Sequence, residues 1–146
     1  MCVDFRNLNA ATVPMKFPLQ NYHSILDRLG GNTIFATIDF RSGFLQIPLD
    51  EASISLTAFS THDGLYEHTW MPFGLMNAPA FFQRTVQLAL GDLVAVICEV
   101  FIDDIIVYAS TAEHFLNNLQ QVLENLWVVL VINYLACMRL LRNKLF

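Results

Sequence analysis

One stretch of the chain, residues 94–108, limits the possible folds most strongly, because it is almost entirely apolar yet contains two adjacent carboxylates, Asp103 and Asp104. Carboxylates in such a stretch cost free energy unless they are exposed, paired or neutralised by a cation. The pattern predicts a β-hairpin with both aspartates at its bend. Solvated aspartates at an exposed tip are the simplest explanation. Tight turns prefer Asn-Gly or Asp-Gly to Asp-Asp, however, and this favours a functional role.

The composition is that of one globular domain. The chain has 146 residues, 55% hydrophobic and 14% charged, which excludes a disordered tail. Three cysteines without a CxxC pair argue against a disulfide framework or a zinc finger and favour a reducing compartment. The longest apolar run, residues 126–137, is shorter than the ~20 residues of a membrane span, so we expect a buried strand or helix and no membrane partner. A net charge of −5 argues against strong binding to a phosphate backbone.

Periodicity predicts the remaining elements. Residues 34–39 alternate as a strand that ends at Asp39, and residues 56–60 and 66–71 are two further extended runs. Helices are predicted over 21–29, capped by Asn21, over 79–91, and after a capping box at residues 110–113. The first twenty residues predict a short strand followed by extended chain. Strands and helices alternate irregularly, with hairpins, so the fold class is α+β.

Asp39 is a third carboxylate at the end of an apolar strand. If neighbouring strands bring Asp39 against the hairpin tip, three carboxylates form a cluster of hard oxygen ligands. Magnesium ions favour a few carboxylates together with substrate phosphates, and a pair of such ions supports phosphoryl transfer. An aspartate that caps the turn after a strand is the commoner case, so both explanations stay open. The four histidines lack zinc-site spacing, and the glycines form neither a dinucleotide fingerprint nor a P-loop.

The chain resembles the fingers–palm region of reverse transcriptases from gypsy-type LTR retrotransposons and their retroviral relatives. The resemblance rests on short motifs that occur in the family's order and spacing. They are VDFRNLN at 3–9, PL at 18–19, IDFRSGFLQI at 38–47, TAF at 57–59, MPFGLMNAPAFFQ at 71–83 and FIDD at 101–104.

This resemblance implies an RNA-directed DNA polymerase with a right-hand fold, an antiparallel sheet packed on helices. Asp39, Asp103 and Asp104 are then the carboxylates that hold two Mg²⁺ ions, or Mn²⁺, for template-directed nucleotidyl transfer. The implied partners are an RNA or DNA template with its primer and deoxynucleoside triphosphates. The parent element would act inside the cell, in the cytoplasm or in a virus-like particle.

The same resemblance implies roles around the incoming nucleotide. Phe44 takes the place of the aromatic steric gate that rejects a ribose 2′-hydroxyl, although an ordinary core phenylalanine is the alternative. Phe40 and Arg41 contact the triphosphate largely through backbone amides, and Phe73 and Gly74 pack against the nucleotide. Arg6 either organises the fingers near template or triphosphate or forms a structural salt bridge.

Departures from the family pattern leave other hypotheses open. Phe101 replaces the usual tyrosine, Leu56 replaces a common lysine, and Glu99 lies in a strand that the family usually keeps apolar. We expect residues 1–146 to be a partial reverse transcriptase domain without thumb, connection and RNase H regions, and those missing regions of the polyprotein to be its partners. A degenerate or domesticated relic without polymerase activity, retaining at most weak nucleic-acid or protein binding, is the second hypothesis. A gene fragment that does not fold alone is the third.

Overall fold

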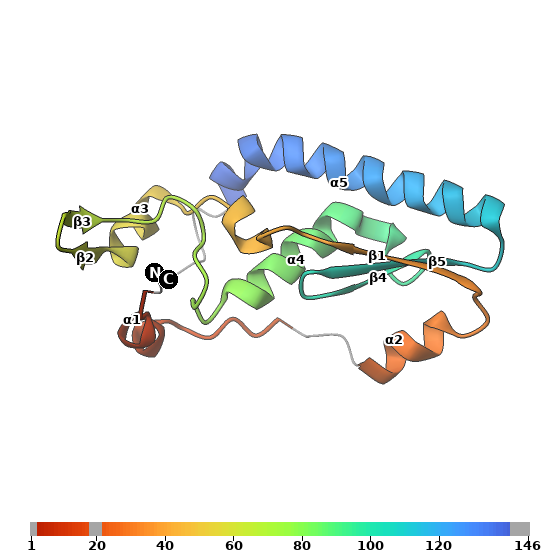
Figure 1. Ribbon diagram of the computed structural model, residues 1–146, viewed down its shortest axis with the longest axis horizontal. Helices are drawn as coiled ribbons and strands as arrows, with labels where there is room; N and C mark the ends of the chain where they lie inside the picture. Colours follow the sequence, from red (N-terminus) through yellow and green to blue (C-terminus); the bar gives the residue numbers. More distant parts are fainter. Residues whose placement is uncertain (1–2, 18–21, 141–146) are drawn as a thin grey trace.

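The computed structural model describes residues 3–17 and 22–140, which form two parts along the long axis of the molecule (Figure 1). The larger part holds strands β1 (Ile34–Asp39), β4 (Cys98–Phe101) and β5 (Asp104–Ala109) and helices α2 (Tyr22–Leu29), α4 (Ala78–Leu90) and α5 (Ala112–Leu140). The smaller part holds helices α1 (Arg6–Ala11) and α3 (Glu51–Ile54) and the hairpin of β2 (Phe59–Thr61) and β3 (Gly64–Tyr66). Short 3-10 helices are η1 (Gly43–Gln46), η2 (Ser55–Thr57) and η3 (Gly91–Leu93). This architecture confirms the α+β class.

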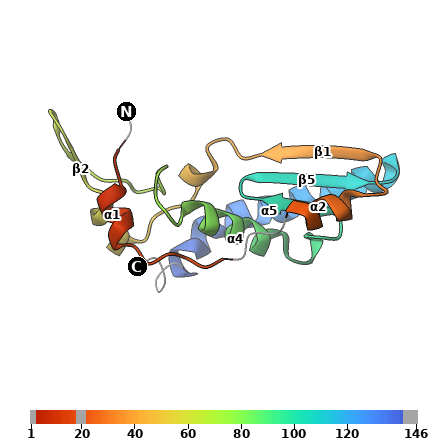
Figure 2. The ribbon, with the colours of Figure 1, turned by 90° about the horizontal axis from the view of Figure 1, so that it is seen from below.

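The central sheet has the order β1–β5–β4, and both strand pairs are antiparallel. Its two faces differ because side chains alternate along each strand. One face carries Cys98, Val100, Ile105 and Val107, all fully buried, and α5 lies on one side of the strands with α2 on the other (Figure 1). Seen after a quarter turn, β1 forms the outer edge of the sheet beside β5 (Figure 2). Strand β4, at the other edge, contacts α4.

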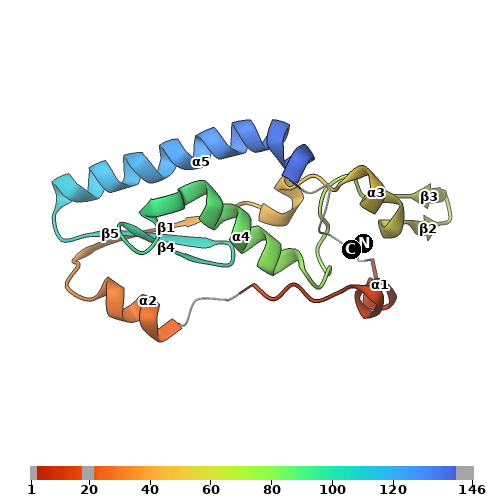
Figure 3. The same cartoon turned by 180° about the vertical axis from the view of Figure 1, so that it is seen from behind.

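The core lies between α4, α5 and the sheet. Phe82, Val86 and Leu90 recur at helical spacing on α4 and are 2–4% exposed, while Val122 and Leu126 face them from α5. Burying each such side chain contributes about 1.5–3 kcal/mol, so this helix pair is the main anchor of the sheet. The two helices run side by side when the molecule is seen from behind (Figure 3).

Several predicted elements are confirmed. Strand β1 spans the predicted residues, and α4 has Pro79 in its first turn and ends before Gly91 at φ +52°. The apolar run 126–137 belongs to helix α5. Among the described residues, no helix combines the length and the apolarity needed to cross a membrane. The proposed cap Asn21 and the motif at 18–19 lie outside the described residues.

The capping box predicted before α5 is wrong by one residue. Thr111, not Ser110, accepts the backbone N–H of His114 through its hydroxyl at 3.3 Å. The third helical position is therefore His114, and Glu113 stands one residue too early to close the box.

The predicted N-terminal strand is also wrong, because residues 6–11 form α1. The carboxylate of Asp4 accepts the backbone N–H of Arg6 at 3.0 Å and so satisfies one of the free donors of the first turn. Extended chain follows from Thr12, as expected.

The predicted bounds of the two extended runs, 56–60 and 66–71, are largely wrong. Asp50 accepts the N–H of Ala52 and starts α3, and the chain continues as η2 to Thr57. The buried Thr57 hydroxyl donates to the carbonyl of Ile54 at 2.7 Å and accepts the N–H of His68 at 2.9 Å. Strands β2 and β3 keep only three residues each, on either side of a turn at residues 62–63.

Candidate functional site

The end of β1 meets the β4–β5 hairpin at one edge of the sheet. Asp39 is the Cα partner of Asp104, and Asp104 is the partner of Phe101, so the three side chains form one row across the strands. The preceding row, Ile38 with Ile105 and Val100, points into the core. The row of Asp39, Asp104 and Phe101 therefore lies on the opposite face, where all three side chains are exposed.

The hairpin bend consists of Ile102 and Asp103, and Asp104 already belongs to β5. The prediction that both aspartates form the bend is therefore wrong by one residue. Ile102 has φ +57°, whereas Asp103 does not have a positive φ, which is the sign pattern of a type II′ turn. A β-branched residue in this conformation is strained, and such strain concentrates at functional sites.

The three carboxylates meet in backbone position. Directly opposed Cα atoms of antiparallel strands are about 4.5–5.5 Å apart, which brings Asp39 within reach of Asp104 and its neighbour Asp103. As placed, no three His, Cys, Asp or Glu side chains within residues 3–17 and 22–140 form a metal-binding group. The oxygen donors suit a hard divalent cation. The carboxylates have to rotate to share one, and the exposure of Asp39 and Asp104 leaves their rotation unobstructed.

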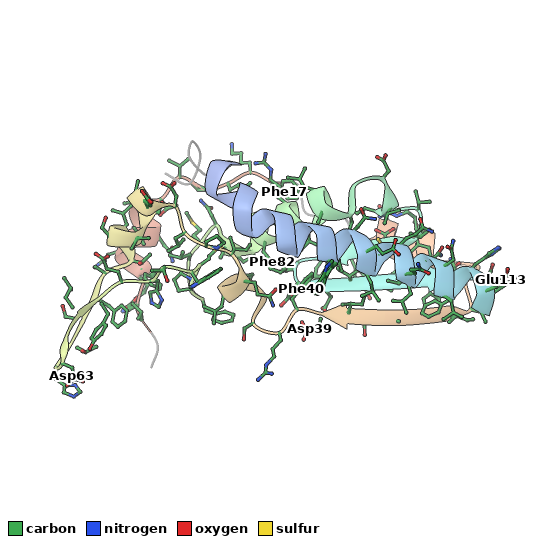
Figure 4. All side chains as sticks on the ribbon, turned by 90° about the horizontal axis from the view of Figure 1, so that it is seen from above. Phe17, Asp39, Phe40, Asp63, Phe82 and Glu113 are labelled. Atoms are coloured by element: carbon green, nitrogen blue, oxygen red, sulfur yellow. The ribbon has the colours of Figure 1, made fainter. Side chains whose placement is uncertain are left out.

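Four phenylalanines form an aromatic cluster beside this edge. The rings of Phe40 and Phe82 are 5.3 Å apart, those of Phe44 and Phe82 5.6 Å, and those of Phe44 and Phe73 5.3 Å. Figure 4 shows Asp39 at the end of β1 with Phe40 and Phe82 close by. Phe82 is buried, Phe44 is half-buried and Phe73 is 56% exposed, so the cluster runs from the core to the surface.

The loop between Asp39 and Phe44 carries two further candidate residues. Arg41 is exposed, and its carbonyl accepts the side-chain N–H of Gln46 at 2.9 Å. The next residue, Ser42, has φ +54°, and the N–H of Gly43 donates to the carbonyl of Phe40 at 3.1 Å. These bonds fix a tight turn directly after Asp39.

Arg6 lies in the smaller part of the molecule, away from the carboxylates of the sheet. It forms a structural salt bridge, the second of the two roles considered for it. Its guanidinium donates to both carboxylate oxygens of Asp4 at 2.6–3.0 Å, and both side chains are exposed. The hydrogen bonds from Arg6 lower the pKa of Asp4. A cavity of about 320 Å³ lies beside this pair, lined by Asp4, Arg6, Asn9, Gly74 and their neighbours Val3 and Phe5.

Two asparagines that the sequence argument did not single out join the smaller part to the segment around Gly74. Asn9 donates to the carbonyl of Gly74 and accepts the N–H of Met76, both at 2.8 Å. Asn77 donates to the carbonyl of Val13 and accepts the N–H of Met15, both at 2.9 Å. Asn9 and Asn77 both lie inside the motifs quoted above, so the motifs could have singled them out from the sequence. Asparagine is so common in turns, however, that residue type alone does not reveal a long-range clamp.

A buried ion pair supports the hairpin from the same face of the sheet. Glu99 on β4 is 1% exposed and accepts two hydrogen bonds from the guanidinium of Arg28 on α2, one of them at 2.9 Å. Burial, and secondarily the charge of Glu99, raises the pKa of the adjacent Cys98 thiol to about 12. Glu99, noted as a departure from an apolar strand, is therefore held by a specific partner.

The sheet is antiparallel and backed by helices, and exposed carboxylates lie at the tip of its hairpin beside an aromatic cluster. This arrangement is typical of a polymerase palm. Residues 1–129 match the family of "Reverse transcriptase (RNA-dependent DNA polymerase)", and the chain belongs to this family. The family generally uses divalent metal ions. The resemblance inferred from the motifs is thus confirmed.

Relatives among retroelements are similar over most of this chain. It is 47% identical over 124 residues to the Retrovirus-related Pol polyprotein from transposon 297 of Drosophila melanogaster, and 44% identical over 126 residues to that from transposon opus of the same organism. These matches cover 85% and 86% of this chain but only 12% and 13% of the polyproteins. The chain thus spans about an eighth of the length of these relatives.

Solved structures share the fold. The foamy viral protease-reverse transcriptase in complex with double-stranded DNA superposes with a TM-score of 0.78 at 28% identity, covering 86% of this chain and 22% of that one. Its complex with an RNA/DNA hybrid gives a TM-score of 0.76 at 28% identity, covering 85% of this chain and 17% of that one. These similarities confirm that the sheet and its helices form the palm of a reverse transcriptase polymerase domain.

Proposed function

We propose that this chain carries the nucleotidyl-transfer centre of an RNA-directed DNA polymerase, with Asp39, Asp103 and Asp104 as its catalytic carboxylates. The observation that carries the proposal is the strand register, in which Asp39 faces Asp104 in the exposed row at the end of the sheet. Asp103 stands beside them in a strained turn. Residues far apart in the sequence thus converge on one solvent-facing point.

The carboxylates would hold two divalent cations, Mg²⁺ or Mn²⁺, which when bound stabilise the attacking and leaving oxygens of phosphoryl transfer. The protein's own contribution is a fixed arrangement of negative charge. The hydrogen-bonded strand pair sets the spacing of Asp39 and Asp104, so little reorganisation is needed beyond side-chain rotation.

The residues around the centre would bind the incoming deoxynucleoside triphosphate. The backbone amides of Phe40 and Arg41 lie in the tight turn after Asp39, where they can donate to phosphate oxygens. Phe44 would exclude a ribose 2′-hydroxyl by its ring.

The strongly exposed Phe73, with Gly74 at φ +95° beside it, offers a surface for the nucleotide. Arg6 would contribute to nucleotide or template binding on leaving Asp4, its partner in the exposed salt bridge. The template and primer would lie against the exposed end of this face, beside Asp39 and Asp104. This is consistent with the relatives solved with double-stranded DNA and with an RNA/DNA hybrid.

Primer extension on a poly-A template with Mg²⁺ tests the proposal. We expect Asp103→Asn and Asp104→Asn to reduce extension by at least about 100-fold, the order of magnitude for losing one preorganised electrostatic group. Asp63→Asn is the matched control, because Asp63 is an exposed aspartate at the far end of the molecule, in the turn between β2 and β3 (Figure 4).

Circular dichroism establishes that each variant is folded. If the folded wild-type chain does not extend primers, or if the Asp103 and Asp104 variants extend them as well as Asp63→Asn does, the proposal is wrong. The first result would favour the non-catalytic relic.

A further inference from the structure

Phe82 on α4 packs against both ends of the loop that connects Asp39 to Phe44. Its ring meets Phe40 edge to face at 5.3 Å and 83°, and meets Phe44 edge to face at 5.6 Å and 79°. The side chain is only 3% exposed. One buried ring thus touches both aromatic residues that flank the turn after the candidate catalytic strand.

Gly43 shows how closely this loop is pressed onto that ring. A Cβ atom at Gly43 would lie 2.7 Å from Cζ and 3.0 Å from Cε2 of Phe82, and 3.1 Å from Cβ of Phe40. Gly43 has no positive φ, so the glycine is required here by space and not by backbone conformation. The backbone of η1 therefore rests directly on the edge of the Phe82 ring.

These contacts form a path from the core to the candidate nucleotide site. Phe82 packs on Phe44, and Phe44 packs on Phe73, which is 56% exposed. Close-packed interiors transmit small displacements, because a ring that loses its support moves into the vacated space. A smaller residue at position 82 would let Phe44 and its backbone sink toward α4.

We propose that Phe82 is a positioning residue for sugar selection. It holds the Phe44 ring in the position in which that ring excludes a 2′-hydroxyl. The inference rests on the proposed function, because it assigns to Phe44 the role of steric gate. Phe82 itself is too deeply buried to touch the nucleotide and acts only through Phe44 and the η1 backbone.

The alternative is that Phe82 is an ordinary member of the core formed with Val86 and Leu90. In that case its truncation lowers stability and slows incorporation of both sugars to the same extent. The positioning role differs because it changes the ratio of ribonucleotide to deoxyribonucleotide incorporation. That ratio is insensitive to the fraction of folded protein.

The test measures this ratio by primer extension with the full chain. We expect Phe82→Leu to raise it about 10-fold, the discrimination that a change of about one or two methylene groups in a pocket produces. Phe82→Met has about the same volume as Phe82→Leu, but its longer, unbranched side chain reaches further toward Phe44 and should give a smaller rise. The control Phe81→Leu shortens the neighbouring, half-buried phenylalanine of the same helix and should leave the ratio within about twofold.

Epistasis decides whether Phe82 acts through Phe44. Phe44→Val alone should raise ribonucleotide incorporation, and adding Phe82→Leu to it should change the ratio no further, because the gate is already gone. An unchanged ratio in Phe82→Leu and Phe82→Met overturns the inference. An equal additional rise in the Phe44→Val background overturns it as well.

A second measurement does not depend on activity. Gly43→Ala should lower the melting temperature strongly in the wild-type chain and by no more than half as much in the Phe82→Leu background, because the shorter side chain vacates the space that the new methyl group needs. The remaining loss comes from the contact with Phe40. Additive losses would show that Phe82 does not support the loop, and the inference would fail. The two substitutions could instead show coupled losses of melting temperature in a chain that extends no primer. That result would reject the proposed function and the role in sugar selection, and it would still show that Phe82 supports the loop by packing.

Discussion

Glu99 and Asp104 stand on the same face of the same sheet, in neighbouring rows of that face, yet their surroundings are opposite. Glu99 is paired with Ile106 across the strands, is 1% exposed and is bound by Arg28. Asp104 is paired with Asp39 and Phe101 in the next row and is exposed. Within the described residues, no hydrogen bond or ion pair engages the side-chain carboxylates of Asp39, Asp103 or Asp104.

The difference comes from α2, which covers one row and leaves the other open. A carboxylate that helix α2 buries must be paired, because desolvation of an unpaired charge costs several kcal/mol. A carboxylate beyond the end of the helix keeps its hydration and its free lone pairs. The two rows therefore divide the tasks: the Glu99 row fixes β4 and α2 to each other, and the Asp104 row presents oxygens to solvent. Substitutions in each row test this division of tasks between the Glu99 row and the Asp104 row.

The largest expected effect is on activity, at the open row. Asp104→Asn should reduce primer extension by at least about 100-fold while changing the free energy of unfolding by less than about 0.5 kcal/mol, because an exposed side chain contributes little to stability. Chemical denaturation measured beside the extension assay checks this. A loss of stability that matches the loss of activity would show that Asp104 serves the fold, and the contrast with Glu99 would disappear.

At the Glu99 row, which α2 covers, substitutions should change stability. Arg28→Met removes the partner of a buried carboxylate and should lower the free energy of unfolding by about 2–3 kcal/mol, less than the full loss for a completely buried pair because the Arg28 side chain is 33% exposed. Glu99→Gln should cost less, because the arginine it leaves unpaired can reach water.

The double variant Arg28→Met with Glu99→Met is the matched control. It replaces the pair by apolar side chains of similar length and should recover most of the lost stability. If the double variant is as unstable as Arg28→Met, the arginine contributes packing and not charge compensation.

The two rows also show what the sequence could predict. Strand β1 and helix α4 follow from periodicity, because their apolar positions face one continuous core. The convergence of Asp39 with Asp103 and Asp104 was expected from strand ends, and the register agrees with it, whereas the site roles themselves stay predictions.

Other features depend on contacts between distant residues. The partner of Glu99 is 71 residues away, and the clamp between Asn9 and Gly74 spans 65 residues. Helix α1 has six residues, too short for periodicity to predict. Local propensity misplaces the hairpin bend by one residue, because Ile102 adopts a conformation that its residue type disfavours.

Cys98 offers a smaller and more local test of the covered row. Its pKa of about 12 arises mainly from burial and then from the charge of Glu99, so the thiol should resist a thiolate-specific reagent at pH 8 in the folded chain. Because the folded pKa lies above the unfolded value of 9.0, this group adds stability below pH 9 that is lost as the pH rises toward 12. Glu99→Gln should lower the pKa of Cys98, measured from the pH dependence of labelling. An unchanged labelling profile would mean that the thiol is protected by burial alone.

The smallest effect is expected at the other arginine–carboxylate pair, Arg6 with Asp4, which has similar hydrogen bonds but no burial. The pair lowers the pKa of Asp4, so any stability it adds is present above pH 3.8, the ordinary pKa, and is lost as the pH falls through the lowered value. Solvent and salt screen an exposed pair, and Arg6→Met should leave the melting temperature at pH 7 and 0.15 M salt within about 1 °C of the wild type. A melting temperature as low as that of Arg28→Met would show that geometry, and not burial, sets the strength of these pairs. The explanation of the two rows by the cover of α2 would then be wrong.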